Sequence, residues 1–258
     1  TTIGYERLLL DAPSRLCLVV GDVTSTMACA IAAQKLCIPV AHVEAGLRTD
    51  TIYSPYPEEM NRRLVSRVAS YHFAATEHNR RTLLGEGVPD EAIFVTGNPV
   101  GDALHAILAR PRSRRGVDDV LQATEGSRRI VLTTHRRESL GQTMRDNLAV
   151  LRRFVETRGD VTLIFPVHPN PSVRESATRV LTAHPRIHLI DPLSYEDFIH
   201  LLSRSWLIVS DSGGVQEEAP TLGKPVLILR ENTERPEAVE AGVARLVGGD
   251  PSRLAAML

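Results

Sequence analysis

Four carboxylates and three arginines are gathered in one short segment, residues 42–63, with the sequence HVEAGLRTDTIYSPYPEEMNRR. Carboxylates can act as general acids and bases when a fold positions them against a reacting group. Glu44 fits this role because it comes directly after an apolar run and directly before a glycine. A solvated glutamate is uncommon at such a place. We therefore expect Glu44 to belong to a reaction centre.

Two interpretations are open for Glu58. It falls in the first turn of a helix expected to begin near Pro55, where the helix dipole favours acids. The pairs Glu58 with Arg62 and Glu59 with Arg63 have i,i+4 spacing, which is enough to describe a salt-bridged surface helix. The pattern leaves a catalytic role for Glu58 open, and it assigns Glu59, Arg62 and Arg63 to a solvated helix face.

Asp22, in the segment GDVTST, also has two interpretations. It follows one apolar run and precedes a helical segment, so its side chain can cap the amino end of that helix. A carboxylate at the end of a strand can also belong to a reaction centre, but the pattern by itself favours capping.

A candidate phosphate site lies in the segment SDSGGVQEEAPTLGKPV. Ser212, Gly213 and Gly214 separate an apolar run from a helix expected to begin near residue 215. Glycines allow backbone N–H groups to approach an anion, and the helix amino end adds positive dipole. Glu218, about one turn into the helix, can reach back to ribose hydroxyls. An ordinary tight turn explains the same glycines.

The segment THRRES places His135 and Arg136 just after another apolar run. Histidine titrates near neutrality, and paired arginines suit an anion. An ion-pair cluster of these arginines with Glu138 is the alternative. His168, in PVHPN, fits a structural histidine in a loop.

Short apolar runs separated by helix-length segments must position these residues. Runs of this kind predict parallel strands that are buried on both faces. The predicted strands are residues 16–20, 40–43, 71–75, 93–97, 130–134, 161–167, 187–191, 207–210 and 225–230. We predict an α/β protein with two doubly wound, Rossmann-like domains, residues 1–100 and 101–258.

Most polar clusters follow the carboxyl end of a predicted strand, which is the edge where open α/β sheets bind ligands. Two such edges that face across a cleft would collect the clusters into one site. The placement of the clusters supports a ligand site more than any single motif does.

The bulk composition excludes several functions. Thirty basic and 31 acidic residues leave no basic excess for nucleic acid. No apolar run approaches the ~20 residues that cross a bilayer, and we predict a cytoplasmic protein without a membrane partner. The three cysteines form no CxxC pair, so buried free thiols explain them better than disulfides or a zinc site.

Several motifs in order along the chain resemble the bacterial non-hydrolysing UDP-N-acetylglucosamine 2-epimerases. They are GDVTST, HVEAGLRT, YSPYPEEMNR, THRRE, PVHPN, DSGGVQEEAPTLGKPVL and TERPEAVEAG. The resemblance implies a fold like that of GT-B glycosyltransferases, a homodimer, no cofactor, and a role in surface polysaccharide synthesis. The family's first strand and its GxRPE-type loop do not occur in the sequence, so the resemblance implies an incomplete amino-terminal domain.

The resemblance also implies the reaction. The family inverts C2 of UDP-GlcNAc to give UDP-ManNAc by eliminating UDP to a 2-acetamidoglucal and adding it back. Carried over by motif, Asp22, Glu44 and Glu58 are the acid/base carboxylates, and His135 contacts UDP or assists its departure. Which carboxylate acts on which face stays open.

The remaining roles are carried over in the same way. Ser212, Gly213 and Gly214 would hold the diphosphate together with Arg136, and Glu218 would bind the ribose. Phe198 looks like the aromatic on the uracil side, although a core phenylalanine fits equally well. Arg136 and His168 match a regulatory site for a second UDP-GlcNAc. A GT-B glycosyltransferase or a UDP-sugar-binding module remains the alternative function.

Overall fold

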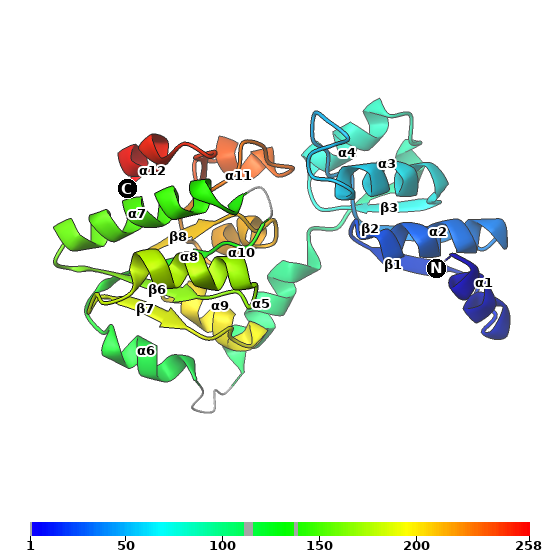
Figure 1. Ribbon diagram of the computed structural model, residues 1–258. Helices are drawn as coiled ribbons and strands as arrows, with labels where there is room; N and C mark the ends of the chain where they lie inside the picture. The colour runs from blue at the N-terminus through cyan, green and yellow to red at the C-terminus, as the bar shows by residue number, and fades with distance from the viewer. Residues whose placement is uncertain (1, 111–115, 137–138) are drawn as a thin grey trace. The chain divides into compact units, whose positions relative to one another are not determined.

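The computed structural model describes residues 2–110, 116–136 and 139–258. The chain divides into two compact units, one ending at Pro99 and the other beginning at Val100. Each unit contains a parallel β-sheet with helices packed against it (Figure 1). The predicted α/β class is confirmed. Within the described ranges, no helix is long and apolar enough to cross a membrane.

The amino-terminal unit has a four-stranded sheet in the order β1-β2-β3-β4, with every pairing parallel. Its strands are β1 (Cys17–Val20), β2 (Val40–Ala45), β3 (Tyr71–Ala74) and β4 (Ile93–Val95). Its helices are α1 (Thr2–Asp11), α2 (Thr24–Lys35), α3 (Glu58–Val68), α4 (Glu77–Gly85) and the 3-10 turn η1 (Asp90–Ala92).

Small side chains allow close packing in this unit. Ala30 and Ala33 of α2 meet Val19 and Val40 of the sheet and Val65 of α3 in one buried cluster. The short side chains let the helix approach the sheet, and the burial of their apolar surface stabilises the arrangement. The ends of β1 and β2 are thereby fixed next to α3.

The carboxy-terminal unit has a six-stranded sheet in the order β10-β9-β8-β5-β6-β7. Its strands are β5 (Arg128–Thr133), β6 (Val161–Pro166), β7 (Ile187–Ile190), β8 (Leu207–Ser210), β9 (Val226–Ile228) and β10 (Ala244–Leu246). Its helices are α5 (Pro99–Ala109), α6 (Val117–Ala123), α7 (Gln142–Thr157), α8 (Pro171–Leu181), α9 (Tyr195–Ser203), α10 (Val215–Thr221), α11 (Pro236–Glu240) and α12 (Pro251–Met257).

Apolar side chains cover both faces of this sheet. Ile130 and Leu132 of β5 pack on one face with residues of α7, α8 and α12. Val131, between them, points to the other face and packs with residues of α5, α6, α9 and α10. Successive strand residues point to opposite faces, so an uninterrupted apolar run is buried on both.

The strand order creates a switch point between β5 and β8. From β5 the chain continues outward through β6 and β7, and it then returns to the other side of β5 to form β8, β9 and β10. Ligands of open α/β sheets bind at the carboxyl ends of strands next to such a switch point. The loops that follow β5 and β8 carry His135, Arg136 and residues 211–214.

Candidate functional site

A fully buried carboxylate, Asp211, joins the two loops at the switch point. Its Oδ2 accepts hydrogen bonds from the Thr134 hydroxyl at 2.7 Å and from the backbone N–H groups of His135 and Arg136 at 3.0 Å each. Its Oδ1 lies 3.6 Å from His135 Nδ1. One side chain after β8 therefore holds the loop after β5 that carries His135 and Arg136.

Arginine side chains flank the glycine turn after β8. A β carbon built on Gly213 would lie 3.3 Å from Arg235 Nη1 and 3.7 Å from Arg136 Nη2. Arg235 is held in place by ion pairs with Glu217 and Glu234. Glu234 Oε1 would lie at the same 3.3 Å from that β carbon, so the turn is flanked by a carboxylate as well as by two guanidinium groups. Guanidinium groups suit an anion with several oxygens.

Glu218, in the first turn of α10, is buried close to the same turn. Its Oε1 accepts a hydrogen bond from the Tyr195 hydroxyl at 3.0 Å and lies 3.9 Å from the position of a β carbon on Gly214. Burial raises the pKa of the Glu218 carboxyl, and the bond from Tyr195 opposes that shift. Burial next to Glu218 also raises the pKa of Tyr195 to about 12.

Phe198 lies one turn after Tyr195 on α9 and is partly buried against the core cluster on that face of the sheet. This contact gives it a packing role, and a role beside uracil stays a prediction.

The imidazole rings of His135 and His168 are stacked. Their centroids are 5.2 Å apart and their planes differ by 16°. The backbone N–H of Asn170 donates to His168 Nδ1 at 3.1 Å, so the outward nitrogen of His168 is Nε2. The structure thus brings a residue expected at the substrate site next to one expected at a regulatory site. Arg137 and Glu138, which the ion-pair alternative requires, lie outside the described residues.

In the amino-terminal unit, Asp22 is held by α3. Nε and Nη2 of Arg62 both donate to Asp22 Oδ2, the former at 2.9 Å, and Asn61 Nδ2 donates to the Asp22 carbonyl at 2.7 Å. The residue before α2 that acts as its cap is Val23, and it makes no side-chain cap bond. The helix-capping interpretation of Asp22 is therefore wrong.

The prediction that Glu59 and Arg62 lie on a solvated helix face is also wrong. Glu59 is fully buried and Arg62 is 3% exposed, and they are joined by an ion pair of 3.3 Å. Glu59 also accepts a hydrogen bond from the Thr49 N–H at 3.1 Å. Arg63 does have a partly exposed side chain and pairs with Glu59 at 2.8 Å. The i,i+4 rule describes contacts along one helix, whereas these side chains also face the loops after β1 and β2.

Glu44 has an unusual backbone conformation at the end of β2. Its φ is +67°, and the pairing of β2 with β3 shifts register between Val43 and Ala45. A left-handed conformation in a residue other than glycine costs free energy and often marks a functional site. Glu44 Oε2 lies 3.2 Å from the position of a β carbon on Gly21, the residue before Asp22. The fold thus brings Glu44 and Asp22 to neighbouring strand ends.

Glu58 is partly exposed in the first turn of α3, four residues before Arg62. Side chains four apart lie on one face of a helix, so Glu58 is on the face that carries the Arg62 contact to Asp22.

A buried histidine of β2 contacts the residue that follows β1. His42 Nε2 donates to the Gly21 carbonyl at 2.9 Å, and the side chain is fully buried. Burial lowers the pKa of His42 to about 4, against the effect of that hydrogen bond. Burial also lowers the pKa of its cross-strand neighbour His72. His42 is therefore neutral at pH 7, and burial favours the neutral form of His72 as well.

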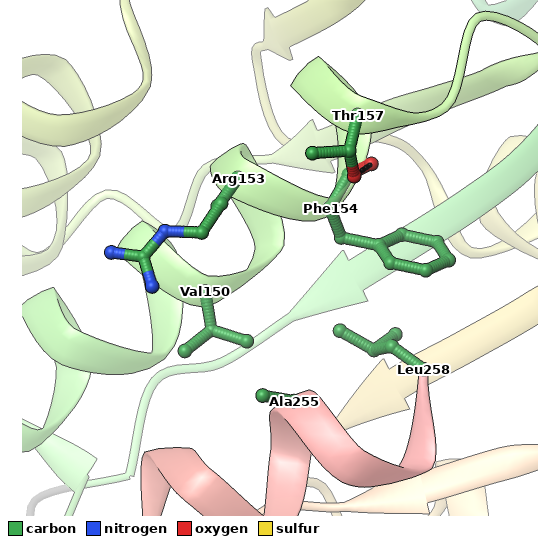
Figure 2. Close-up of a pocket in the computed structure, with 6 residues that line it drawn as sticks. All are labelled: Val150, Arg153, Phe154, Thr157, Ala255 and Leu258. Atoms are coloured by element: carbon green, nitrogen blue, oxygen red, sulfur yellow. Dashed lines mark hydrogen bonds between the residues drawn. The ribbon is translucent and has the colours of Figure 1, made fainter.

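A pocket of about 180 Å³ lies between α7 and α12. Figure 2 shows that it is lined by Val150, Arg153, Phe154, Thr157, Ala255 and Leu258. The last turns of α7 lead into β6, so they lie at the amino edge of the sheet, opposite the polar loops. The pocket contains none of the predicted site residues. In the described ranges, no cluster of three or more His, Cys, Asp or Glu could hold a metal ion.

Comparison with known proteins decides the family. The family model for UDP-N-acetylglucosamine 2-epimerase matches residues 1–258. The chain belongs to the UDP-N-acetylglucosamine 2-epimerase family. The UDP-N-acetylglucosamine 2-epimerase of Salmonella typhimurium is 47% identical over an aligned length of 262 residues, and the match covers 98% of this chain and 69% of that protein. The Escherichia coli K12 enzyme of the same name is 46% identical over an aligned length of 256 residues, and the match covers 97% of this chain and 68% of that protein.

Solved structures of the family agree with these sequences. The UDP-GlcNAc 2-epimerase from Neisseria meningitidis bound to UDP-GlcNAc has a TM-score of 0.91 at 40% identity and covers 99% of this chain. An S. aureus structure with UDP has a TM-score of 0.94 at 39% identity, with 99% coverage of this chain. The present chain spans 70% and 69% of those two chains. The predicted membership of the epimerase family, with its GT-B-like fold, is confirmed.

Proposed function

We propose that this protein interconverts UDP-GlcNAc and UDP-ManNAc. The observation that carries the proposal is the placement of Glu44 and Asp22 at neighbouring strand ends, with Glu44 in a left-handed backbone conformation. Inversion at C2 requires one group that removes a proton and another that delivers one from the opposite face. Two carboxylates held by different elements can divide these tasks.

The reaction proceeds by elimination and re-addition. A carboxylate takes the C2 proton while the C1–O bond to UDP breaks, which gives a 2-acetamidoglucal and free UDP. UDP then adds back at C1, and a second group protonates C2 from the other face. No adjacent carbonyl acidifies C2, so departure of the diphosphate must be coupled to loss of the proton. Asp22, Glu44 and Glu58 are the carboxylates assigned to these steps.

The carboxy-terminal unit holds the leaving group. Gly213 and Gly214 approach the diphosphate with backbone N–H groups, and Arg136 supplies positive charge. Ser212 lies beside them, with its own N–H donating to Ser210 Oγ at 2.9 Å. His135 stabilises the departing diphosphate from its place after β5. Residues 1–100 thus form the acid/base domain and residues 101–258 the UDP-binding domain.

The nucleoside lies beyond the diphosphate. Glu218 accepts the ribose hydroxyls, with Tyr195 fixing the carboxylate, and Phe198 lies on the uracil side. A second UDP-GlcNAc binds close to Arg136 and His168 as an activator. The stacking of His168 on His135 supports a link between this regulatory site and the departing diphosphate. The protein acts in the cytoplasm as a homodimer.

Replacement of Glu44 by glutamine tests the proposal. Loss of a positioned acid/base group is expected to lower the rate of UDP-ManNAc formation by roughly 10²- to 10⁴-fold. The affinity for UDP should change little, because Glu44 belongs to the other unit. Rates are measured by chromatographic separation of the two epimers, and affinity by calorimetry. A variant that loses only affinity would remove Glu44 from the chemistry.

A further inference from the structure

An arginine that the helix pattern assigns to solvent is buried against one of the reactive carboxylates. Arg62 has a side chain that is 4% exposed, and the Asp22 side chain beside it is 23% exposed. We propose that Arg62 is a positioning residue that makes Asp22 exchange protons through Oδ1 alone. The inference rests on the proposed function, because it concerns one carboxylate of that reaction.

The geometry selects one carboxylate oxygen. Nε and Nη2 of Arg62 both donate to Oδ2 of Asp22. An oxygen that accepts two N–H groups of a cation cannot also carry a proton directed at those donors. A proton that Asp22 takes or gives must therefore be on Oδ1. Asn61, next to Arg62, fixes the main chain of Asp22 by donating to its carbonyl at 2.7 Å.

The buried Glu59 carboxylate holds the Arg62 guanidinium in place. Its Nη1 donates to Oε2 of Glu59 at 3.3 Å, and Glu59 is fully buried. The same Oε2 accepts the backbone N–H of Thr49 at 3.1 Å, in the loop after β2. The guanidinium thus bridges a fixed internal carboxylate and a reactive one. A buried ion pair of this kind contributes little net stability and is explained better by the geometry that it imposes.

Lysine cannot reproduce this arrangement. A guanidinium presents several donors in one plane, whereas an ammonium is a point charge on a flexible stem. Arg62→Lys keeps the positive charge but removes the planar set of N–H donors. It therefore changes the orientation of Asp22 and leaves the local charge the same. A small displacement of a catalytic group can lower the rate by about 10²-fold.

A double-mutant cycle tests the inference. kcat and KM for UDP-GlcNAc are measured for the unmodified chain, Arg62→Lys, Asp22→Asn and the double variant. We expect Arg62→Lys to lower kcat by about 10- to 100-fold with KM within about threefold. In the Asp22→Asn background the second substitution should have no further effect on kcat, because Arg62 acts through Asp22. Arg67→Lys, at an exposed side chain of the same helix, is the matched control and should match the unmodified chain.

Each outcome has a meaning. If the losses of kcat in the two single variants multiply in the double variant, Arg62 acts independently of Asp22. That result would overturn the inference while the proposed function stands. Absence of epimer from the unmodified chain would overturn both. Circular dichroism and the Kd for UDP report whether each variant is folded. Where Arg62→Lys does not fold, the nearly isosteric Glu59→Gln takes its place in the same cycle, with a several-fold loss of kcat expected only when Asp22 is present.

Discussion

The Asp211 carboxylate offers the sharpest test of how the switch point is built, because one buried side chain holds two loops. The perturbation is Asp211→Asn, which keeps the shape of the side chain and removes its charge. Three hydrogen bonds converge on Oδ2, from Thr134, His135 and Arg136. Hydrogen bonds to a charged group contribute about 1.5–3 kcal/mol each and neutral ones about 0.5–1.5 kcal/mol. A loss of roughly 1 kcal/mol per bond lowers the free energy of unfolding by about 3 kcal/mol.

The assay combines urea denaturation with calorimetric titration of UDP. We expect the lower free energy of unfolding to be accompanied by a Kd for UDP about tenfold higher, equivalent to about 1.4 kcal/mol, since the loop that carries Arg136 loses its anchor. Asp250→Asn is the matched control. Asp250 is exposed and caps α12 by accepting the Ser252 N–H at 2.8 Å. Asparagine caps helices as well as aspartate does, so this variant should keep both values.

Two results would refute this account of Asp211. Unchanged stability would mean that the three hydrogen bonds do not hold the loop after β5. A loss of stability with unchanged Kd would mean that the position of that loop does not control UDP binding.

Further predictions concern single positions in both units. Gly46→Ala should lower the free energy of unfolding, measured by urea denaturation, by more than about 2 kcal/mol. Gly46 has a φ of +88°, and a β carbon there would lie 2.5 Å from the Asn79 carbonyl oxygen. The pKa of His42 is depressed from 6.5 to about 4, so between those pH values the unfolded state binds more protons than the folded state. The free energy of unfolding should therefore fall as the pH is lowered from 6.5 to 4, by at most about 3 kcal/mol. The slope of unfolding free energy against pH should decrease in His42→Gln. Tyr195→Phe removes the hydroxyl that donates to Glu218 and should raise the Kd for UDP several-fold, measured by calorimetry, with kcat nearly unchanged.

The fold was predictable because its strands are nearly continuous apolar runs. Ile130, Val131 and Leu132 are all fully buried, which is what such a run requires in a sheet covered on both faces. The strand β10 was not predicted. It has three residues, Ala244, Arg245 and Leu246, and owes its conformation to pairing with β9 and not to its own composition.

The grouping of the candidate site residues at strand ends was predictable, and their contacts were less so. Polar clusters after strands placed His135, Arg136 and residues 212–214 at one edge, because parallel strands end together. Asp211 precedes the glycine turn directly, yet its bonds to the loop after β5 depend on the pairing of β5 with β8. The sequence places those two strands far apart.

The errors on α3 have the same origin. Local spacing suggested that Glu58 pairs with Arg62 and Glu59 with Arg63 along a solvated helix surface. The burial of Glu59 and Arg62 is instead set by Asp22 and by the loop after β2. Tyr195 and Arg235 were missed because their partners, Glu218 and Glu217, come from α10.

Incubation with UDP-GlcNAc and, separately, UDP-ManNAc in D₂O tests the central claim most directly, with mass spectrometry of both nucleotide sugars after chromatography. Removal of the C2 proton by one carboxylate and protonation of C2 from the other face by a second, solvent-exchanged group predict that each substrate yields the other epimer with deuterium at C2. Epimer without deuterium would contradict proton exchange through solvent-accessible carboxylates, and unchanged, unlabelled substrate would contradict epimerase activity in this chain.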